Sequence, residues 1–361
     1  MSGGVDSSVA AALLTEAGHE VVGATMKTFC YTGTVDHGKT CCGLDGIRDA
    51  RKVARALGVE HHVFDVEEDF TRDVIDDFVA EYGRGRTPNP CVRCNSFTKF
   101  QDLRRRARDL GCDAVATGHY VRSSHPEHPG PGLFRGLDPR KDQSYFLWGI
   151  PRESLSEVVF PVGGLTKAEV RDRARALDLV TAEKPESQEI CFVPTGDYRD
   201  LLKSRMTASH PGLEPGEIVD VDGGVLGRHQ GYANFTVGQR KGLGGGLAGP
   251  RFVVEIRAEE RQVVVGPREA LFADNLGVDE LNWLVPEPPT EGALVSVQLR
   301  YRAPAVSAVI AGIDAESLAL DLVEPHAAVT PGQSAVLFQG DRVLGGGRIQ
   351  GGSSIPGGAS D

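Results

Sequence analysis

Residues 2 to 8 read Ser-Gly-Gly-Val-Asp-Ser-Ser, and an apolar helical pattern follows them at once. Adjacent glycines let a backbone turn tightly and approach a ligand closely, while serines supply hydroxyl donors. At a helix N-terminus the exposed N–H groups and the helix dipole both favour an anion. The chain has no GxxxxGK[ST] pattern, so no lysine follows the glycines as a ligand for a terminal phosphate. The stretch therefore predicts a phosphate-binding loop.

The first half of the chain alternates β-rich and helical patterns. Short β-rich runs that are separated by helices indicate parallel βαβ units in a doubly wound α/β sheet. Thr166 and Glu169 have the spacing of a capping box, which predicts a helix start. We expect strands at 19–27, 59–66 and 112–120, and helices at 46–58, 70–85, 97–111 and 165–179.

The character of the sequence changes after about residue 205. Glycine and proline separate short β-branched runs, and strand patterns recur between residues 270 and 350, which is typical of a small β-barrel. We expect the barrel strands within 292–301, 305–313, 318–323, 333–339 and 342–349 and a disordered tail over 351–361. Three domains are predicted, at 1–205, 206–270 and 271–361.

Composition narrows the class of protein. The 361 residues are 40% hydrophobic and 25% charged, as in globular proteins. No apolar run approaches the ~20 residues that cross a bilayer, and no charged leader precedes an apolar stretch, which predicts a cytoplasmic protein without a membrane partner. Seven cysteines without a leader indicate thiols, not a disulfide framework. The net charge of −11 argues against a wholly basic surface but not against a local basic patch.

Cys91 and Cys94 form a CxxC motif. Such a pair is a zinc half-site, a redox pair, or a catalytic thiol with its neighbour. Four-ligand zinc is disfavoured because no second CxxC or close histidine pair follows. Cys191 is the natural distant partner for a thiol reaction.

Six motifs together resemble one family. SGGVDSS is similar to the pyrophosphate loop of the ATP pyrophosphatases, which cleave ATP between the α- and β-phosphates and adenylate a substrate oxygen. Five further strings follow in order along most of the chain, and with the loop they resemble the tRNA-specific 2-thiouridylase family. They are TPNPCVRCN (87–95), ATGHYVR (116–122), KDQSYFL (141–147), SQEICFV (187–193) and VGQRKGLG (237–244).

The resemblance implies a fold and a reaction. The fold is an adenine-nucleotide α-hydrolase-like parallel sheet, a small central domain and a C-terminal β-barrel. The reaction is ATP-dependent 2-thiolation of the wobble uridine of tRNA, with Mg²⁺ and a persulfide sulfur-donor protein. Cys94 then corresponds to the nucleophile and Cys191 to the persulfide carrier, since sulfur transfer needs two thiols that are close in space.

The resemblance also assigns binding residues. A wobble uridine lies in a single-stranded loop, so its extrusion into a pocket costs little. The nucleotide would contact Ser2, Gly3, Gly4, Val5, Asp6, Ser7, Met26 and Gly118, with Asp6 positioning magnesium or pyrophosphate. The tRNA would contact Asn89, Pro90, Cys91, His119, Lys141, Asp142, Gln143, Arg300, Tyr301 and Gln333.

Two features depart from the family pattern. Its members have a short apolar strand before the loop, so we expect the natural chain to begin roughly ten residues earlier, enough for such a strand. Many members carry aspartate where Cys91 stands, and a thiol of pKa ~8.5 does not replace a carboxylate of ~3.9. Cys91, Cys94 and Cys191 would alternatively hold three corners of a 4Fe–4S cluster whose fourth iron binds sulfide.

Two rival functions remain at this point. Another ATP pyrophosphatase, such as an amide-forming synthetase for a small metabolite, needs neither paired thiols nor an RNA surface. A non-enzymatic RNA-binding protein would release no pyrophosphate from ATP.

Overall fold

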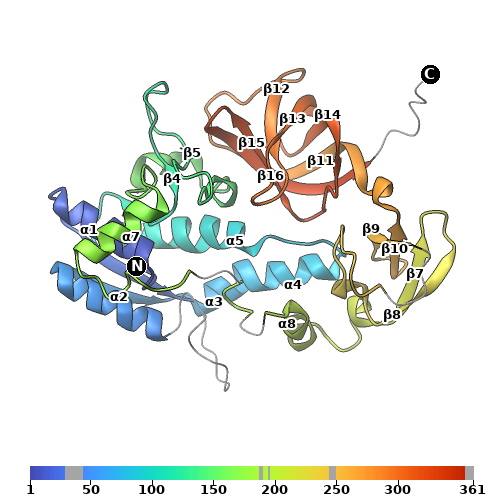
Figure 1. Ribbon diagram of the computed structural model, residues 1–361, viewed down its shortest axis with the longest axis horizontal. Helices are drawn as coiled ribbons and strands as arrows, with labels where there is room; N and C mark the ends of the chain where they lie inside the picture. The colour runs from blue at the N-terminus through green and yellow to red at the C-terminus, as the bar shows by residue number, and fades with distance from the viewer. Residues whose placement is uncertain (29–43, 187–189, 194–195, 244–248, 354–361) are drawn as a thin grey trace. The chain divides into compact units, whose positions relative to one another are not determined.

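The computed structural model describes residues 1–28, 44–186, 190–193, 196–243 and 249–353, and it divides into two compact units (Figure 1). The first unit comprises Met1–Ile75, Pro90–Asp197 and Asp341–Val343. The second comprises Asp76–Asn89, Tyr198–Gly340 and the chain from Leu344 onward. Within the described ranges, no helix combines the length and the apolar character that crossing a membrane requires.

The first unit holds the predicted α/β domain. Its elements follow the expected alternation, which confirms the α/β interpretation. They are α1 (Val5–Glu16), β1 (Val22–Lys27), α2 (Leu44–Leu57), β2 (Glu60–Asp65), α3 (Glu67–Phe70), η2 (Thr71–Ile75), α5 (Pro90–Arg93), η3 (Cys94–Asp102), α6 (Leu103–Asp109), β3 (Val115–Ala116), β4 (Val121–Arg122), β5 (Phe134–Arg135), η4 (Ser144–Phe146), η5 (Arg152–Glu157), β6 (Val158–Val159) and α7 (Lys167–Ala176).

The parallel strands form two separate pairs. β1 runs parallel to β2, in register from Val22 opposite Glu60 onward, and β3 runs parallel to β6. Met1 lies against β1, because the hydroxyl of Thr25 donates to its carbonyl oxygen at 2.6 Å. This hydrogen bond fixes Met1, the residue before the phosphate-loop sequence, beside β1.

Helix α1 is held by apolar packing against α7, and the two lie side by side in Figure 1. Val9 is completely buried and shares a core with Val170 and Ala174 of α7. The predicted capping box at the start of α7 is confirmed: the Thr166 hydroxyl accepts from the Glu169 N–H, and the Glu169 carboxylate accepts from the Thr166 N–H. This cap fixes where α7 begins.

The second unit contains a four-stranded sheet and a barrel. The sheet has the order β8-β7-β10-β9, and β10 pairs parallel with β7. The predicted boundaries at 205 and 270 remain predictions. The elements outside the barrel are α4 (Asp76–Gly83), α8 (Tyr198–Arg205), η6 (Pro211–Leu213), β7 (Gly216–Asp220), β8 (Val225–His229), η7 (Tyr232–Asn234), β9 (Phe252–Arg257), β10 (Gln262–Gly266) and η8 (Arg268–Leu271).

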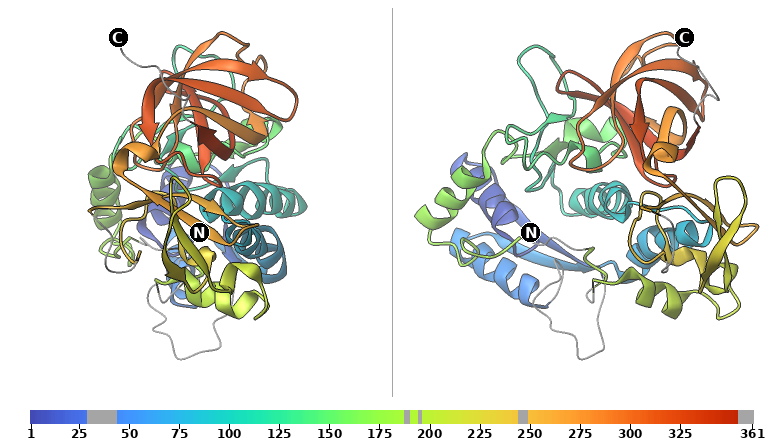
Figure 2. Two further views of the ribbon diagram at one scale, coloured as in Figure 1. Left: turned by 90° about the vertical axis from the view of Figure 1, so that its right-hand side faces the viewer. Right: turned by 45° about the vertical axis from the view of Figure 1, so that its right-hand side comes forward.

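The predicted barrel is confirmed, and Figure 2 shows its strands curving into a barrel. Buried side chains from these strands form one hydrophobic core. The order β11-β14-β13-β12-β15-β16 closes through a further pairing of β16 with β11. Strand β11 was not predicted, and β16 runs on through the first residues of the stretch expected to be disordered; 354–361 lie outside the described residues. The strands are β11 (Phe272–Trp283), β12 (Leu294–Gln298), β13 (Val306–Ile313), β14 (Leu318–Ala327), β15 (Ser334–Gln339) and β16 (Arg342–Ser353).

A buried charge cluster joins α4 to the barrel within the second unit. Arg348 of β16, 7% exposed, forms ion pairs with Asp77 at 3.1 Å, Glu81 at 2.9 Å and Glu280 at 3.3 Å. Glu81 is fully buried and also binds Arg84 and Arg86. Burial acts to raise the pKa of Glu81, but the arginines outweigh it and hold that pKa below its ordinary value. Arg348 and Glu81 can therefore both stay charged while buried only because each has partners of opposite charge.

Candidate functional site

The loop sequence lies at the N-terminus of α1, as predicted. Gly4 is the residue before the helix and caps it without a side-chain hydrogen bond. The Ser7 hydroxyl accepts from the Ser2 N–H at 3.1 Å and lies 3.2 Å from the carbonyl oxygen of Gly4, so it ties the loop to the first turn. Helical N–H groups and the positive end of the dipole therefore converge at Ser2–Gly4, where a phosphate is favoured.

Two glycines make this arrangement possible. Gly3 has φ of +69°, and a Cβ there would overlap the carbonyl of Gly46 in α2. Gly118, just after β3, packs on the loop so tightly that a Cβ would lie 2.6 Å from Asp6 C and Ser7 N. The sequence interpretation placed Gly118 beside the nucleotide; in the structure its closest backbone neighbour is the loop itself.

We predict that Gly118→Ala displaces the loop. Backbone atoms at 2.6 Å cannot yield without moving the Asp6–Ser7 peptide, and a shift of about 1 Å at a reaction centre costs roughly 100-fold in rate. The measurement is ATP affinity and pyrophosphate release. Gly164→Ala is the matched control, because a Cβ at Gly164 meets nothing within 4 Å. Equal behaviour of the two variants would contradict the prediction.

Asp6 is engaged by two side chains that the sequence did not single out. The Tyr120 hydroxyl donates to its carboxylate at 2.7 Å, and Lys167 Nζ donates to both oxygens at 2.7 and 2.9 Å. Burial, then the negative charge of Asp6, raises the pKa of Tyr120, so the phenol stays protonated. Asp6 therefore faces a lysine in this structure, and its predicted role at magnesium or pyrophosphate remains a prediction.

The same lysine continues into a chain of charges. Lys167 pairs with Glu186 at 3.0 Å, and Glu186 pairs with Lys141 at 2.6 Å. Burial acts to raise the pKa of Glu186, but hydrogen bonds and charges from Lys141 and Lys167 lower it to about 2. Two carboxylates and two ammonium groups thus extend from the loop to the predicted tRNA-binding segment 141–143.

The thiols lie on segments that both reach α3. Cys94 begins η3, which packs against α3, and Phe192, next to Cys191, packs edge-on against Phe70 of α3 at 5.8 Å between ring centroids. Cys91 is exposed, whereas Cys94 and Cys191 are partly buried. Cys30, Cys41 and Cys42 lie outside the described residues. The convergence of Cys94 and Cys191 remains a prediction, which their common neighbour supports.

The three-cysteine ligand set for an iron–sulfur cluster is not assembled. Among the residues that the structure describes, which include Cys91, Cys94 and Cys191, no group of three or more histidine, cysteine, aspartate or glutamate side chains is placed to hold a metal ion. The described thiols therefore do not fit a cluster in this conformation.

Residues predicted to contact tRNA near β4 have partners inside the protein. Asp142 accepts from Arg135 at 2.8 Å and from the Ser144 hydroxyl at 2.8 Å, and Gln143 accepts from the Tyr120 N–H at 2.9 Å. His119 is 9% exposed, with its Nδ1 2.8 Å from the Thr117 hydroxyl. Burial, then the charge of Lys99, lowers the pKa of His119 far enough to keep it neutral.

The remaining predicted residues are buried or partly buried. Met26 is partly buried in β1 opposite Phe64, Pro90 is buried at the start of α5, and Asn89 is partly buried. In the second unit, Arg300 donates to the carbonyl of Val237 and to the hydroxyl of Thr330. Their ligand contacts remain predictions.

Gln333 and Tyr301 complete the predicted barrel contacts. Gln333 Nε2 donates to the carbonyl of Thr87 at 2.8 Å, so this barrel residue holds the beginning of the TPNPC segment. The Arg302 guanidinium lies 5.2 Å from the centre of the Tyr301 ring. Thr87 and Arg302, the two neighbouring residues, belong to the second unit, as do Gln333 and Tyr301.

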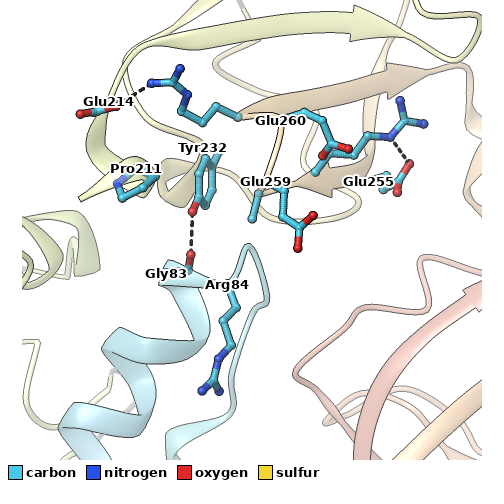
Figure 3. A pocket seen from close by; sticks show the side chains of 11 residues that line it. Gly83, Arg84, Pro211, Glu214, Tyr232, Glu255, Glu259 and Glu260 are labelled. Carbon is cyan, nitrogen blue, oxygen red and sulfur yellow. Dashed lines mark hydrogen bonds and ion pairs between the residues drawn. The ribbon is translucent and has the colours of Figure 1, made fainter. Parts of the chain in front are cut away.

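A cleft of about 890 Å³ lies elsewhere, in the second unit (Figure 3). Tyr232 donates to the carbonyl of Gly83 at 2.6 Å on one wall, and Glu214 pairs with Arg261 on another. It contains none of the predicted site residues. Two ion pairs join residues of its lining, Arg261 with Glu214 and Arg257 with Glu255.

Comparison with known families covers nearly the whole chain. The family described as tRNA methyl transferase HUP domain matches residues 1–195. The tRNA methyl transferase PRC-barrel domain matches residues 203–267, and the aminomethyltransferase beta-barrel domain matches residues 273–349.

Curated relatives are similar over the same length. The tRNA-specific 2-thiouridylase MnmA of Geobacter metallireducens is 50% identical over 355 residues, which is 96% of this chain and 94% of the relative. The protein of the same name from Carboxydothermus hydrogenoformans is 47% identical, with 96% and 94% covered. That from Thermus thermophilus is 48% identical, with 96% and 92% covered.

Proposed function

The chain belongs to the tRNA-specific 2-thiouridylase family, and we propose that it converts the wobble uridine of tRNA to 2-thiouridine through adenylation and persulfide transfer. It is a tRNA-uridine 2-sulfurtransferase that uses ATP and Mg²⁺. The observation that carries this conclusion is the 50% identity over 355 residues. The alternative of an amide-forming synthetase is not favoured, because the relatives that align with nearly the whole chain are named 2-thiouridylases.

The loop residues fit the nucleotide's phosphates. Ser2, Gly3 and Gly4 lie at the positive end of α1, and Gly118 packs closely against the Asp6–Ser7 peptide. ATP supplies an α-phosphorus that uracil O2 attacks, with pyrophosphate as the leaving group. The loop would hold that pyrophosphate, since helix N–H groups stabilise the charge that develops on it.

Sulfur transfer then uses the two thiols. The terminal sulfur of a Cys191 persulfide attacks C2 of uracil, and AMP departs with the former O2. The Cys94 thiolate next attacks Sγ of Cys191, which releases 2-thiouridine and leaves a Cys94–Cys191 disulfide. A dithiol reductant returns both residues to thiols, and a persulfide-carrying protein reloads Cys191.

We propose the persulfide route and not the cluster route, because the described cysteines form no group placed to hold a metal ion. Because its substrates are tRNA and ATP, we propose a cytoplasmic location. We further propose the domain division 1–205, 206–270 and 271–361, with Arg300, Tyr301 and Gln333 as tRNA contacts from the barrel. The predicted contacts at Asn89, Pro90 and Lys141 belong to the same proposal.

The test is a combined assay on unmodified tRNA after anaerobic purification. We expect pyrophosphate release that depends on tRNA, 2-thiouridine formation with a persulfide donor, and no stoichiometric iron or sulfide. Absence of tRNA-dependent pyrophosphate release would contradict the function. Stoichiometric iron and sulfide that activity requires would contradict the persulfide route alone.

A further inference from the structure

Cys91 is the member of the CxxC motif to which the proposed reaction gives no chemical step. Cys94 and Cys191 carry the sulfur, and one turnover leaves them joined as a disulfide. That disulfide must be opened before Cys191 can accept persulfide sulfur again. Cys91 is exposed, whereas Cys94 and Cys191 are partly buried. Because thiol–disulfide exchange depends on access, an external reductant reaches Cys91 more readily than the other two thiols.

Cys91 and Cys94 lie three residues apart in one helical stretch. α5, η3 and α6 follow one another without a break from Pro90 to Asp109, and Arg93, between the two cysteines, has φ of −59° and ψ of −46°. Helix geometry places the Cα atoms of residues i and i+3 about 5 Å apart. Disulfides join Cα atoms that are roughly 4.4 to 6.8 Å apart. The backbone therefore brings Cys91 within reach of Cys94.

The sulfur-bearing side chains need only a small local adjustment to meet. On a helix surface the Cβ atoms of residues i and i+3 lie about 5 to 6 Å apart, whereas a disulfide needs roughly 3.5 to 4.5 Å. Cys91 is the second residue of α5, and the N–H groups of a first helical turn make no intrahelical hydrogen bonds. This end of the helix can therefore adjust without loss of the ladder behind it.

The neighbouring side chains anchor this helix start in the first unit. Val92 is 5% exposed, and the buried Ser96 hydroxyl donates to its carbonyl oxygen at 2.9 Å. The Asn95 side-chain amide donates to the carbonyl oxygen of Phe146 at 3.3 Å. These contacts hold the turn that carries both thiols of the motif, while Cys91 itself stays accessible to solvent. The exposed thiol is thereby kept at a fixed distance along the helix from Cys94.

We propose that Cys91 is the resolving thiol of the sulfur-transfer cycle, an assignment that rests on the proposed function. Cys91 gives its proton to water, and its thiolate attacks Sγ of Cys94. The Cys91–Cys94 bond forms, the Cys94–Cys191 bond breaks, and Cys191 leaves as a thiolate, ready for the next persulfide sulfur. This exchange involves no net oxidation or reduction. A dithiol reductant then attacks the exposed Cys91 sulfur, departs as its own disulfide, and returns Cys91 and Cys94 to thiols.

Competing explanations of Cys91 differ in which turnover they affect. A residue that only contacts the tRNA slows the first turnover as much as the later ones. A cluster ligand, when replaced, causes loss of iron and of activity together. A thiol without a role affects no turnover. A resolving thiol affects the later turnovers alone, and it determines which disulfide remains after the first.

The test compares single and multiple turnovers of the full chain on unmodified tRNA with ATP and a persulfide donor. We expect Cys91→Ser, preloaded with persulfide, to form 2-thiouridine at the wild-type rate in its first turnover. With dithiothreitol as reductant, its steady-state rate should fall by about 10-fold or more, because an intramolecular thiol reacts at a far higher effective concentration than an external one. Cys112→Ser is the matched control, since Cys112 is a thiol outside the motif, and it should keep both rates.

Peptide mass spectrometry identifies the disulfide that remains after one turnover without reductant, once the other thiols have been alkylated. We expect a Cys91–Cys94 disulfide in the wild type. In Cys91→Ser the exchange cannot occur, so we expect the Cys94–Cys191 disulfide to persist.

The outcomes separate this assignment from the proposed function. A wild type that forms 2-thiouridine but retains only the Cys94–Cys191 disulfide would overturn the resolving role alone. So would a wild-type steady-state rate for Cys91→Ser, or equal losses in its first and later turnovers. A wild type that forms no 2-thiouridine at all would overturn the proposed function, and the assignment of Cys91 with it.

Discussion

Replacing Cys94 or Cys191 with serine is expected to abolish tRNA thiolation while ATP affinity stays at the wild-type value. A hydroxyl neither carries persulfide sulfur nor attacks an S–S bond at neutral pH, so each variant lacks a step that the other residue cannot supply. Removal of a covalent participant typically costs orders of magnitude, and we expect a loss of at least about a thousandfold. Pyrophosphate release should continue, because adenylation precedes either thiol step.

The assay measures 2-thiouridine formation and pyrophosphate release in parallel. Cys112→Ser is the control: Cys112 is also a partly buried thiol of the first unit, and it follows α6 without being part of any of the predicted motifs. Full thiolation by Cys94→Ser or Cys191→Ser would refute the assigned roles. Equal loss with Cys112→Ser would indicate a general effect on folding.

Arg348→Met is expected to lower the free energy of unfolding of the second unit by about 3 to 5 kcal/mol, the usual cost of removing one partner of a buried ion pair. Glu81 is fully buried and Asp77 largely so, and the substitution takes away the arginine that both carboxylates share. Methionine retains an apolar stem but removes the guanidinium, so the lost charge and its hydrogen bonds dominate the effect.

Urea unfolding followed by tryptophan fluorescence in a Trp148→Phe background measures this loss, since the remaining tryptophan, Trp283, lies in β11 of the same unit. Arg257→Met is the matched control, because the Arg257–Glu255 pair is largely exposed and such pairs contribute little. A midpoint for Arg348→Met no lower than that for Arg257→Met would show that the cluster does not stabilise this unit.

Local signals in the sequence predicted much of the fold. The capping box located α7, and the β-branched runs between glycine and proline located β12 to β16, because both patterns involve neighbouring residues. Strand β11 escaped prediction since aspartate, asparagine and glycine interrupt its alternation, and its pairing with β14 and β16 shifts register. The expected helix over 70–85 contains the π-helical turn η2, whose wider hydrogen bonding leaves no clear sequence signature.

The site was predictable only in part. The SGGVDSS loop is one continuous motif, so its place at a helix N-terminus follows from the sequence alone. Lys167 and Tyr120 were missed because their hydrogen bonds to Asp6 span 161 and 114 residues. The packing of α7 on α1 creates the first of these links. The LTK stretch at residues 165–167 drew attention solely as a helix start. The available signal was a lysine at the first position of a helix, where the helix dipole favours an acidic side chain.

The order in which the chain passes through the two units affects how the protein folds while it is being synthesised. Asp76–Asn89 is made early but belongs to the same unit as strands that are translated much later; Asp77 and its partner Arg348 in β16, the last strand, are 271 residues apart. Until Arg348 has been translated, Glu81 and Asp77 lack its guanidinium. The carboxylates of α4 are then only partly neutralised. A fragment that stops near residue 197 would expose this helix permanently, and such truncations should aggregate or be degraded although they contain the entire nucleotide loop.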